Sequence, residues 1–367
     1  MYNPKKNIVA LLLILSLAMS LFTVYVYSDS APKVSAKSAA LYEPQSGRFI
    51  YTKQHRISRG MASTTKIMTA ILALENLSGD EIIEAEEDSC GIEGSSIYLA
   101  PGEKMSAEDL IYALILQSAN DAAATLATEI SGSLEEFSSL MNEKAKELSL
   151  CDTHFENPHG LDSENHYTSA HDLALLASYA LKNPKFKEIS STKKRTVESS
   201  DKTRILVNHN KLLKSYDGCI GIKTGYTKKT GRSLVSAAER DSLTLICATL
   251  DAPDDWNDHA LLLDYGFSML EARKLASANE FSFTLPVLSG KSSSVTVSNK
   301  SELIKIIDRT EKTVETRIEL PRFLTAPINK STPVGKVLFY LGDKEIATLD
   351  LYPEYNVEKK KEKLSFL

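Results

Sequence analysis

The chain has 367 residues, a formal net charge of −5 and a pI near 5.9, and 43% of its residues are hydrophobic and 25% charged. This ordinary composition excludes the disordered, collagen-like and disulfide-scaffold classes of protein. The acidic balance offers no uniform positive field to a phosphate backbone, so nucleic acid is not expected as a partner. The length exceeds that of a usual single hydrophobic core and predicts two domains.

The N-terminus has the features of an export segment. No charged residue occurs between Lys6 and Asp29, and residues 8–26 are almost wholly apolar. A basic start before an apolar run of about 20 residues is typical of a signal peptide, and also of a retained anchor. We predict a cleaved signal over residues 1–28, with the retained anchor as the alternative. The protein is then extracytoplasmic, secreted or associated with the cell envelope, and peripheral contact with the membrane stays open.

The four cysteines give no sign of a metal site. Cys90, Cys151, Cys219 and Cys247 lie far apart, without C-x-x-C spacing, which argues against zinc and against a thioredoxin-type motif. Oxidation is open to an exported chain, although cysteines in a chain of this size are more often small core residues. We expect at most one disulfide, no metal and no cofactor.

The first predicted elements are a hairpin and a helix. Residues 39–55 form two apolar runs on either side of a P-Q-S-G turn, which indicates antiparallel strands. Apolar residues then recur at helical spacing over residues 64–77, and Gly79 follows as a stop signal. Ser63 therefore lies at the start of this helix.

Three more helices are predicted before the pattern changes, over residues 106–118, 133–148 and 169–181. Ser106 with Asp109 three residues later predicts an N-terminal cap, and the last of these helices opens on a serine in the same way. These helices form the middle of the chain.

The next part of the chain reads as strands. Short β-branched or apolar runs at residues 220–224, 232–238 and 243–250 are separated by turn signals, which predicts an antiparallel meander. A helix over residues 256–269 would pack back on it. The predicted fold class is α+β, with an antiparallel sheet built from N- and C-terminal strands and covered by helices.

Beyond residue 280 apolar and polar residues alternate in short runs separated by turn signals, which indicates a small all-β module. These runs are residues 294–297, 313–320, 335–340 and 345–351. We therefore expect a larger α+β domain over residues 29–280, an all-β domain over residues 281–355 and a charged tail over residues 356–367.

Three short motifs occur in one order along the chain. They are S-T-T-K at residues 63–66, S-A-N at residues 118–120 and K-T-G at residues 223–225. Each is weak alone. Together, at a helix start, after a helix and on a strand, they form the serine-acylating set shared by penicillin-binding proteins and serine β-lactamases.

Longer stretches carry a family resemblance. The chain resembles the D-alanyl-D-alanine carboxypeptidases among the low-molecular-mass penicillin-binding proteins, over about residues 37–355. The matching stretches are ASTTKIMTA, GSSIYLAPGE, SANDAA, NPHGLDSENHYTSAHDLALLA and GIKTGYT, with PVGKVLFYLGDKEIATLDLY in the β module. The resemblance implies removal of the terminal D-alanine from the pentapeptide stem of peptidoglycan, covalent capture by β-lactams, and a catalytic domain over residues 29–280.

The nucleophile follows from helical spacing. A serine hydroxyl needs a neighbouring base, and Ser63 and Lys66 lie on one face of a helix at i and i+3. Lys66 must be neutral for part of the time, so burial and a second positive charge, for which Lys223 is the candidate, should lower its pKa.

The remaining roles follow from the motif set. Backbone N–H groups of Ser63 and Tyr226 are expected to bind the oxyanion. Ser118 would relay a proton to the leaving nitrogen, and Asn120 would hold the substrate amide and Lys66.

Substrate recognition is assigned to the K-T-G strand. Lys223 and Thr224 suit the free carboxylate of the terminal D-alanine. The strand from Thr224 through Gly225 and Tyr226 would align the substrate as an added strand.

Two alternatives stay open. A serine β-lactamase would use a glutamate to clear the acyl-enzyme, but Glu156 lacks the E-x-x-L-N setting, so fast β-lactam hydrolysis is not expected. A non-catalytic peptidoglycan-binding protein of the same fold is opposed by the intact motif set. His159, in an N-P-H-G loop, is assigned to loop positioning. The sequence does not fix stem-peptide preference, oligomeric state or a vegetative or sporulation role.

Overall fold

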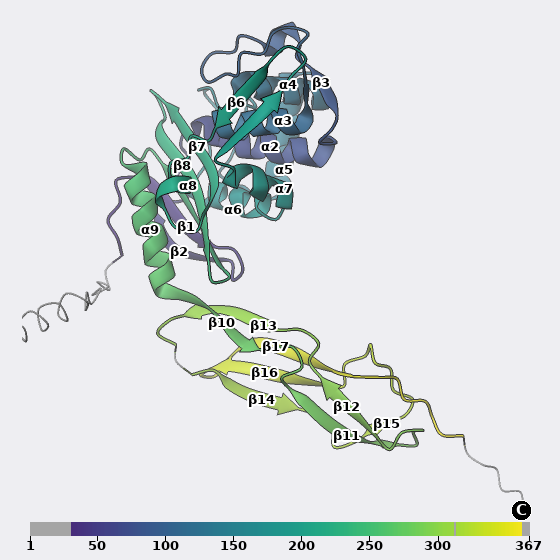
Figure 1. The fold of residues 1–367 in the computed structure, drawn as a ribbon. Coiled ribbons are helices and arrows are strands. Elements are labelled where there is room, and N and C mark those ends of the chain that lie inside the picture. Colours follow the sequence, from purple (N-terminus) through teal and green to yellow (C-terminus); the bar gives the residue numbers. More distant parts are fainter. Residues whose placement is uncertain (1–30, 312, 362–367) are drawn as a thin grey trace, which may run out of the picture. The chain divides into compact units, whose positions relative to one another are not determined.

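The computed structural model describes residues 31–311 and 313–361, so the signal segment predicted over residues 1–28 lies outside the described residues. A five-stranded antiparallel sheet has the order β2-β1-β9-β8-β7 (Figure 1). Its strands are β1 (Ser38–Glu43), β2 (Arg48–Lys53), β7 (Cys219–Thr227), β8 (Gly231–Arg240) and β9 (Leu243–Leu250). The predicted hairpin, meander and α+β fold class are confirmed, and β7 is an edge strand.

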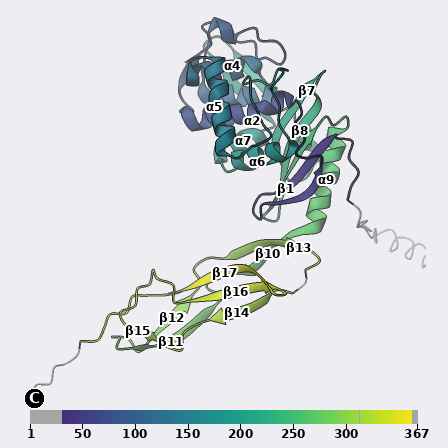
Figure 2. The ribbon, with the colours of Figure 1, turned by 180° about the vertical axis from the view of Figure 1, so that it is seen from behind.

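Helices cover both faces of this sheet (Figures 1 and 2). Side chains alternate along a strand, so Ala40 and Tyr42 of β1 join the core beneath the main helical group, whereas Leu41 packs toward α9. The helices are α2 (Lys66–Asn76), α3 (Ala107–Tyr112), α4 (Asn120–Ser131), α5 (Leu134–Glu147), α6 (Ala170–Ala180), α7 (Pro184–Ser191), α8 (Leu212–Ser215) and α9 (Asp255–Met269), with short 3-10 turns at Ala62–Thr65 and Glu87–Ser89.

Caps and helix ends agree with the sequence in most places. Ser106 Oγ accepts a hydrogen bond from Asp109 N at 3.2 Å, and Ser169 Oγ accepts one from Asp172 N at 3.1 Å. The helix predicted over residues 106–118 differs, because after α3 the chain widens into a π-helical turn at Ala113–Gln117. This turn ends on Ser118, which the sequence pattern treated as ordinary helix.

Several elements were not predicted. Helix α4, buried along most of its length, was not predicted. Two small hairpins outside the main sheet were also not predicted. They are β3 (Ile82–Glu84) with β4 (Lys104–Ser106), and β5 (Lys194–Glu198) with β6 (Thr203–Val207).

The C-terminal part of the chain is all-β, as predicted. A six-stranded sheet has the order β14-β16-β17-β12-β11-β15, and β10 pairs with β13. Alternating apolar residues such as Val295, Val297, Val337 and Phe339 form its own hydrophobic clusters. Its strands are β10 (Leu270–Ala276), β11 (Ser282–Leu288), β12 (Ser294–Ser298), β13 (Leu303–Asp308), β14 (Glu315–Glu319), β15 (Leu324–Thr325), β16 (Gly335–Leu341) and β17 (Lys344–Pro353).

One buried carboxylate joins the segment before β1 to α9. Asp258 accepts hydrogen bonds from Ser35 N and Ser35 Oγ, each at 2.7 Å, and from Ala36 N at 2.8 Å. We expect Asp258→Ala to lower the free energy of unfolding by about 2 kcal/mol, because it leaves the buried Ala36 N and the two donors of Ser35 without their acceptor. Denaturant titration measures the change. Asp254→Ala is the matched control, since Asp254 is exposed at the same helix end and makes no side-chain cap; equal losses for both variants would contradict the prediction.

Candidate active site

The S-T-T-K motif folds as a 3-10 turn, Ala62–Thr65, that continues directly into α2. This places Ser63 and Lys66 one turn apart, and Lys66 Nζ lies 3.1 Å from Ser63 Oγ. The Thr64 hydroxyl donates to Met61 O at 2.6 Å, and the Thr65 hydroxyl donates to Ala62 O at 2.7 Å, which fixes the turn. The hydroxyl of Ser63 is therefore held against the amine of Lys66.

Lys66 is completely buried. Its Nζ also donates to Asn120 Oδ1 at 2.6 Å and to the carbonyl oxygen of His159. Burial lowers the pKa of Lys66 well below its usual value, the charge of Lys223 lowers it further, and the charge of Asp121 opposes both. A lysine with this pKa can exist as a neutral amine and accept a proton from Ser63.

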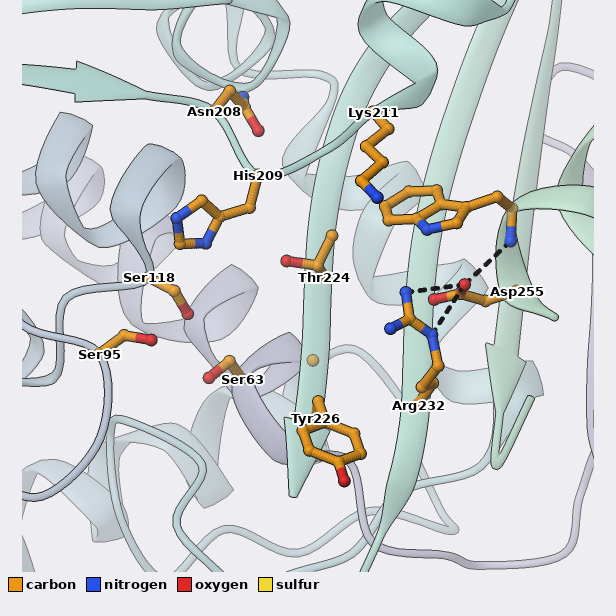
Figure 3. Close-up of a pocket in the computed structure, with 12 residues that line it drawn as sticks. Ser63, Ser95, Ser118, Asn208, His209, Lys211, Thr224, Tyr226, Arg232 and Asp255 are labelled. Carbon is orange, nitrogen blue, oxygen red and sulfur yellow. Dashed lines mark hydrogen bonds and ion pairs between the residues drawn. The ribbon is translucent and has the colours of Figure 1, made fainter. Parts of the chain in front are cut away.

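Ser118 reaches the site through an unusual backbone. It ends the π-helical turn in the left-handed region, at φ 61° and ψ 30°, and is 4% exposed. Figure 3 shows the hydroxyls of Ser63, Ser95 and Ser118 facing one another on one side of β7. The left-handed residue turns the chain from the π-helical turn into α4, whose first residue, Asn120, contacts Lys66.

Strand β7 passes directly against the Ser63 turn. A Cβ atom at Gly225 would lie 3.0 Å from Met61 O and 3.1 Å from Ser63 N, so only glycine allows this approach. The backbone of Gly225, the residue before Tyr226, therefore lies against that of Ser63.

Lys223 is buried beneath the strand, 1% exposed, and its Nζ donates to Thr224 O at 3.1 Å. Burial lowers the pKa of Lys223 to about 7. Its charge acts on Lys66 from below the surface of the site.

An open cavity of about 540 Å³ lies in front of these groups (Figure 3). Of the predicted site residues, Ser63, Ser118, Thr224, Gly225 and Tyr226 line it, whereas Lys66, Asn120 and Lys223 lie buried behind its wall. The other lining residues are Ser95, Asn208, His209, Lys211, Arg232, Asp255 and Trp256.

The sequence reasoning missed a charged cluster in this cavity. Nε and Nη2 of Arg232 each lie 2.9 Å from Asp255 Oδ1, and the guanidinium carbon lies 5.6 Å from the centre of the Trp256 ring. Arg232 is opposite Tyr226 in the β7–β8 register. The hairpin register could have placed Arg232 beside the K-T-G strand, but Asp255 and Trp256 come from α9 and carry no such signal.

The N-P-H-G loop supports the site from behind. Asn157 Oδ1 accepts from Gly160 N at 2.7 Å, and the Thr69 hydroxyl donates to Pro158 O at 2.6 Å. Burial lowers the pKa of His159 to about 3, so its ring is neutral, and its carbonyl oxygen binds Lys66. The loop thus acts through its backbone, in agreement with the positioning role expected for it.

Residues 31–311 and 313–361 contain no group of three or more histidine, cysteine or acidic side chains that could hold a metal ion. In the same part of the chain no helix is long and apolar enough to cross a membrane.

The fold and the paired Ser63 and Lys66 define a serine-acylating enzyme of the penicillin-binding class. The family model described as D-alanyl-D-alanine carboxypeptidase matches residues 25–254, and the model described as penicillin-binding protein 5, C-terminal domain, matches residues 270–359. The chain belongs to the D-alanyl-D-alanine carboxypeptidase family. It is a serine-type carboxypeptidase acting on peptidoglycan, which confirms the predicted family, function and enzyme class.

Similar proteins extend over nearly the whole chain. D-alanyl-D-alanine carboxypeptidase DacF of Bacillus subtilis (strain 168) is 35% identical over 336 residues, 88% of this chain and 86% of the relative. D-alanyl-D-alanine carboxypeptidase DacC of Escherichia coli (strain K12) is 32% identical over 347 residues, 90% of this chain and 86% of the relative. The crystal structure of penicillin binding protein 5 from Haemophilus influenzae has a TM-score of 0.69 at 27% identity, and the match covers 90% of this chain and 100% of that one.

Gly160 provides a test of how the loop supports Ser63. Its φ is +88°, and a Cβ atom there would lie 2.0 Å from Ala62 O. We expect Gly160→Ala to lower the free energy of unfolding by about 3 kcal/mol, because strain and a backbone clash add, and to slow penicillin labelling. Gly132→Ala is the control, with φ +79° and nothing within 4 Å of the added Cβ. Equal melting temperatures and equal rates of penicillin labelling for the two variants would contradict this prediction.

Proposed function

We propose that Ser63 is the nucleophile that removes the terminal D-alanine from peptidoglycan pentapeptide stems through an acyl-enzyme. The observation that carries this proposal is the 3.1 Å contact between Ser63 Oγ and the fully buried Lys66 Nζ at the wall of an open cavity. A serine hydroxyl beside an amine of lowered pKa is an activated nucleophile.

In the acylation step, Ser63 Oγ attacks the carbonyl carbon of the penultimate D-alanine while neutral Lys66 accepts the hydroxyl proton. The N–H groups of Ser63 and Tyr226 bind the negative oxygen that forms. Ser118 passes a proton to the nitrogen of the leaving D-alanine, and the C–N bond breaks. Water then attacks the ester, which releases the shortened stem and restores the Ser63 hydroxyl.

The substrate is expected to lie along β7. Because β7 is the edge of the five-stranded sheet, its outer backbone groups are free to pair with an extended peptide. Thr224, Gly225 and Tyr226 line the cavity along that edge. Asn120 holds Lys66 through Oδ1, and its Nδ2 binds Glu93 O, so its expected contact with the substrate amide stays a prediction.

The terminal carboxylate is the group that separates a carboxypeptidase from an internal peptide cutter. Thr224 lines the cavity, Lys223 adds positive charge from beneath it, and Lys211 and Arg232 line the same space. Nε and Nη2 of Arg232 are bound by Asp255, which leaves Nη1 to donate to a carboxylate. We assign this group of cations to recognition of the substrate carboxylate.

A long-lived penicillin adduct is expected as well. Glu156, the acid considered as a deacylating base, does not line the cavity, and its Oε2 accepts from Asn165 N at 3.0 Å within its own loop. In the described part of the chain, no hydrogen bond or ion pair joins Glu156 to Ser63. This supports slow release of a β-lactam and favours the carboxypeptidase over the β-lactamase alternative. We further propose that the protein acts outside the cytoplasm, where stem peptides lie.

Replacing Ser63 tests the nucleophile. We expect Ser63→Ala to abolish both labelling by fluorescent penicillin and D-alanine release from a D-Ala-D-Ala-ended peptide, since no acyl-enzyme can form. Ser139→Ala, an exposed serine on α5, should retain both signals. Labelling retained by Ser63→Ala would refute the assignment, and labelling of the wild type that decays within seconds would favour the β-lactamase alternative.

Replacing Arg232 tests carboxylate recognition. We expect Arg232→Gln to raise KM for a D-Ala-D-Ala-ended peptide about tenfold, because a charge-assisted hydrogen bond is lost. Lys229→Gln removes the same charge from the exposed β7–β8 turn and should leave KM unchanged. Equal KM values for Arg232→Gln and the wild type would exclude contact between Arg232 and the carboxylate.

A further inference from the structure

An irregular loop forms one wall of the cavity. Residues 94–100 belong to no helix or strand, yet Ser95 lines the cavity and Ile97 and Leu99 are buried. Tyr98 points outward, 79% exposed, with φ at +57°. A loop with so little regular structure requires other contacts to hold it in one conformation.

The carboxylate of Asp121 binds this loop from the inside. Asp121 is completely buried and lies in the first turn of α4. Its Oδ1 accepts from Ile97 N at 3.2 Å, and its Oδ2 accepts from Leu99 N at 3.0 Å and from the Ser96 hydroxyl at 2.5 Å. Both oxygens of one carboxylate thus hold residues 96–99 of the loop against the helix.

Glu103 and Arg204 hold the same loop from the outside. Arg204 forms an ion pair with both carboxylate oxygens of Glu103, at 2.5 and 2.9 Å, and donates to Ile97 O at 2.8 Å and Tyr98 O at 3.2 Å. Burial alone would raise the pKa of Glu103, but hydrogen bonds from Arg204 and Ser199 outweigh it and lower the pKa to about 2. The carboxylate of Asp121 on one side and the Glu103–Arg204 ion pair on the other therefore hold the loop in place.

The loop in turn fixes Asn120. Asn120 N donates to Ser95 O at 2.7 Å, and its Nδ2 donates to Glu93 O. A Cβ atom at Gly94 would lie 2.9 Å from this Nδ2, so glycine permits the approach. With Nδ2 bound to the loop, Oδ1 must face Lys66, which it contacts at 2.6 Å.

We propose that Asp121 is a positioning residue for Lys66: its carboxylate fixes the loop that orients Asn120, and its negative charge opposes the effect of the positive charge of Lys223 on the buried amine. This inference rests on the proposed role of Lys66 as the base. Asp121 directly follows the S-A-N motif. In this role it acts through the loop and through its charge, without contact with the substrate.

Every charged or titratable group acting on Lys66 can be named. Asp121 lies on α4, Lys223 on β7, and His159 and His166 on the loop behind the site. Burial lowers the pKa of His159 to about 3 and that of His166 to about 4, so both rings are neutral near pH 7. Asp121 and Lys223 are then the two charges that set the protonation of Lys66.

The sign of the effect is definite. A negative charge favours the protonated amine, so replacing Asp121 by a neutral residue lowers the pKa of Lys66 further. Acylation requires neutral Lys66, and its rate rises with pH through that pKa. In a plot of acylation rate against pH, the rise on the acid side (the acid limb) should therefore move to lower pH. A residue that only supported the fold would lower the rate at every pH and leave the limb in place.

The experiment measures the second-order rate of acylation of the full chain by benzylpenicillin as a function of pH. We expect Asp121→Asn to lower the plateau rate and to move the acid limb by about one pH unit to lower pH. Glu103→Gln loosens the same loop without removing a charge that acts on Lys66, so it should lower the plateau alone. An acid limb of Asp121→Asn at the wild-type pH would overturn the proposal.

Two more variants keep the test decisive. If Asp121→Asn does not fold, Ser96→Ala removes one loop contact to Asp121 and retains the charge. It should slow acylation with an unmoved limb, and an unchanged rate would overturn the positioning role. Loss of labelling in Ser63→Ala, measured alongside, shows that the profile reports acylation of Ser63, so failure of the proposed function is distinguished from failure of this inference.

Discussion

The structure depends on the burial of one ammonium group. A buried lysine is costly unless it finds hydrogen-bond acceptors or loses its charge. Lys66 finds three acceptors, and they come from three separate segments: the Ser63 hydroxyl in its own turn, the Asn120 amide at the start of α4, and the His159 carbonyl in the N-P-H-G loop. The same contacts that satisfy the amine therefore bring together the parts of the chain that carry the chemistry.

Close backbone packing provides the rest of the site. Gly225 lets β7 touch the Ser63 turn, and Gly160 lets the N-P-H-G loop touch Ala62. The turn that bears the nucleophile is thus packed closely against two backbone segments. A preorganised nucleophile and preorganised N–H donors need no rearrangement during the reaction, which is how such sites gain most of their rate.

The sequence was informative where spacing is local. Helical spacing placed Ser63 beside Lys66, and strand patterns predicted the sheet that presents Thr224 and Gly225. It was uninformative where contact depends on tertiary structure. The left-handed Ser118 follows a π-helical turn that no periodicity reveals, and Arg232 meets Asp255 only because α9 packs beside β8. In the sequence Asp121 is only the residue after the S-A-N motif. Its contacts with residues 96–99 depend on the tertiary structure.

The two buried lysines offer a way for substrate binding to change the protonation of Lys66. Lys66 and Lys223 lie in a region of low dielectric, and two like charges there favour a state in which one amine is neutral. In the proposed mechanism a substrate carboxylate enters beside Thr224 and favours the charged form of Lys223. That positive charge then disfavours protonation of Lys66. On this proposal, binding of the correct chain end prepares the base, and recognition of the carboxylate and activation of Ser63 are electrostatically coupled.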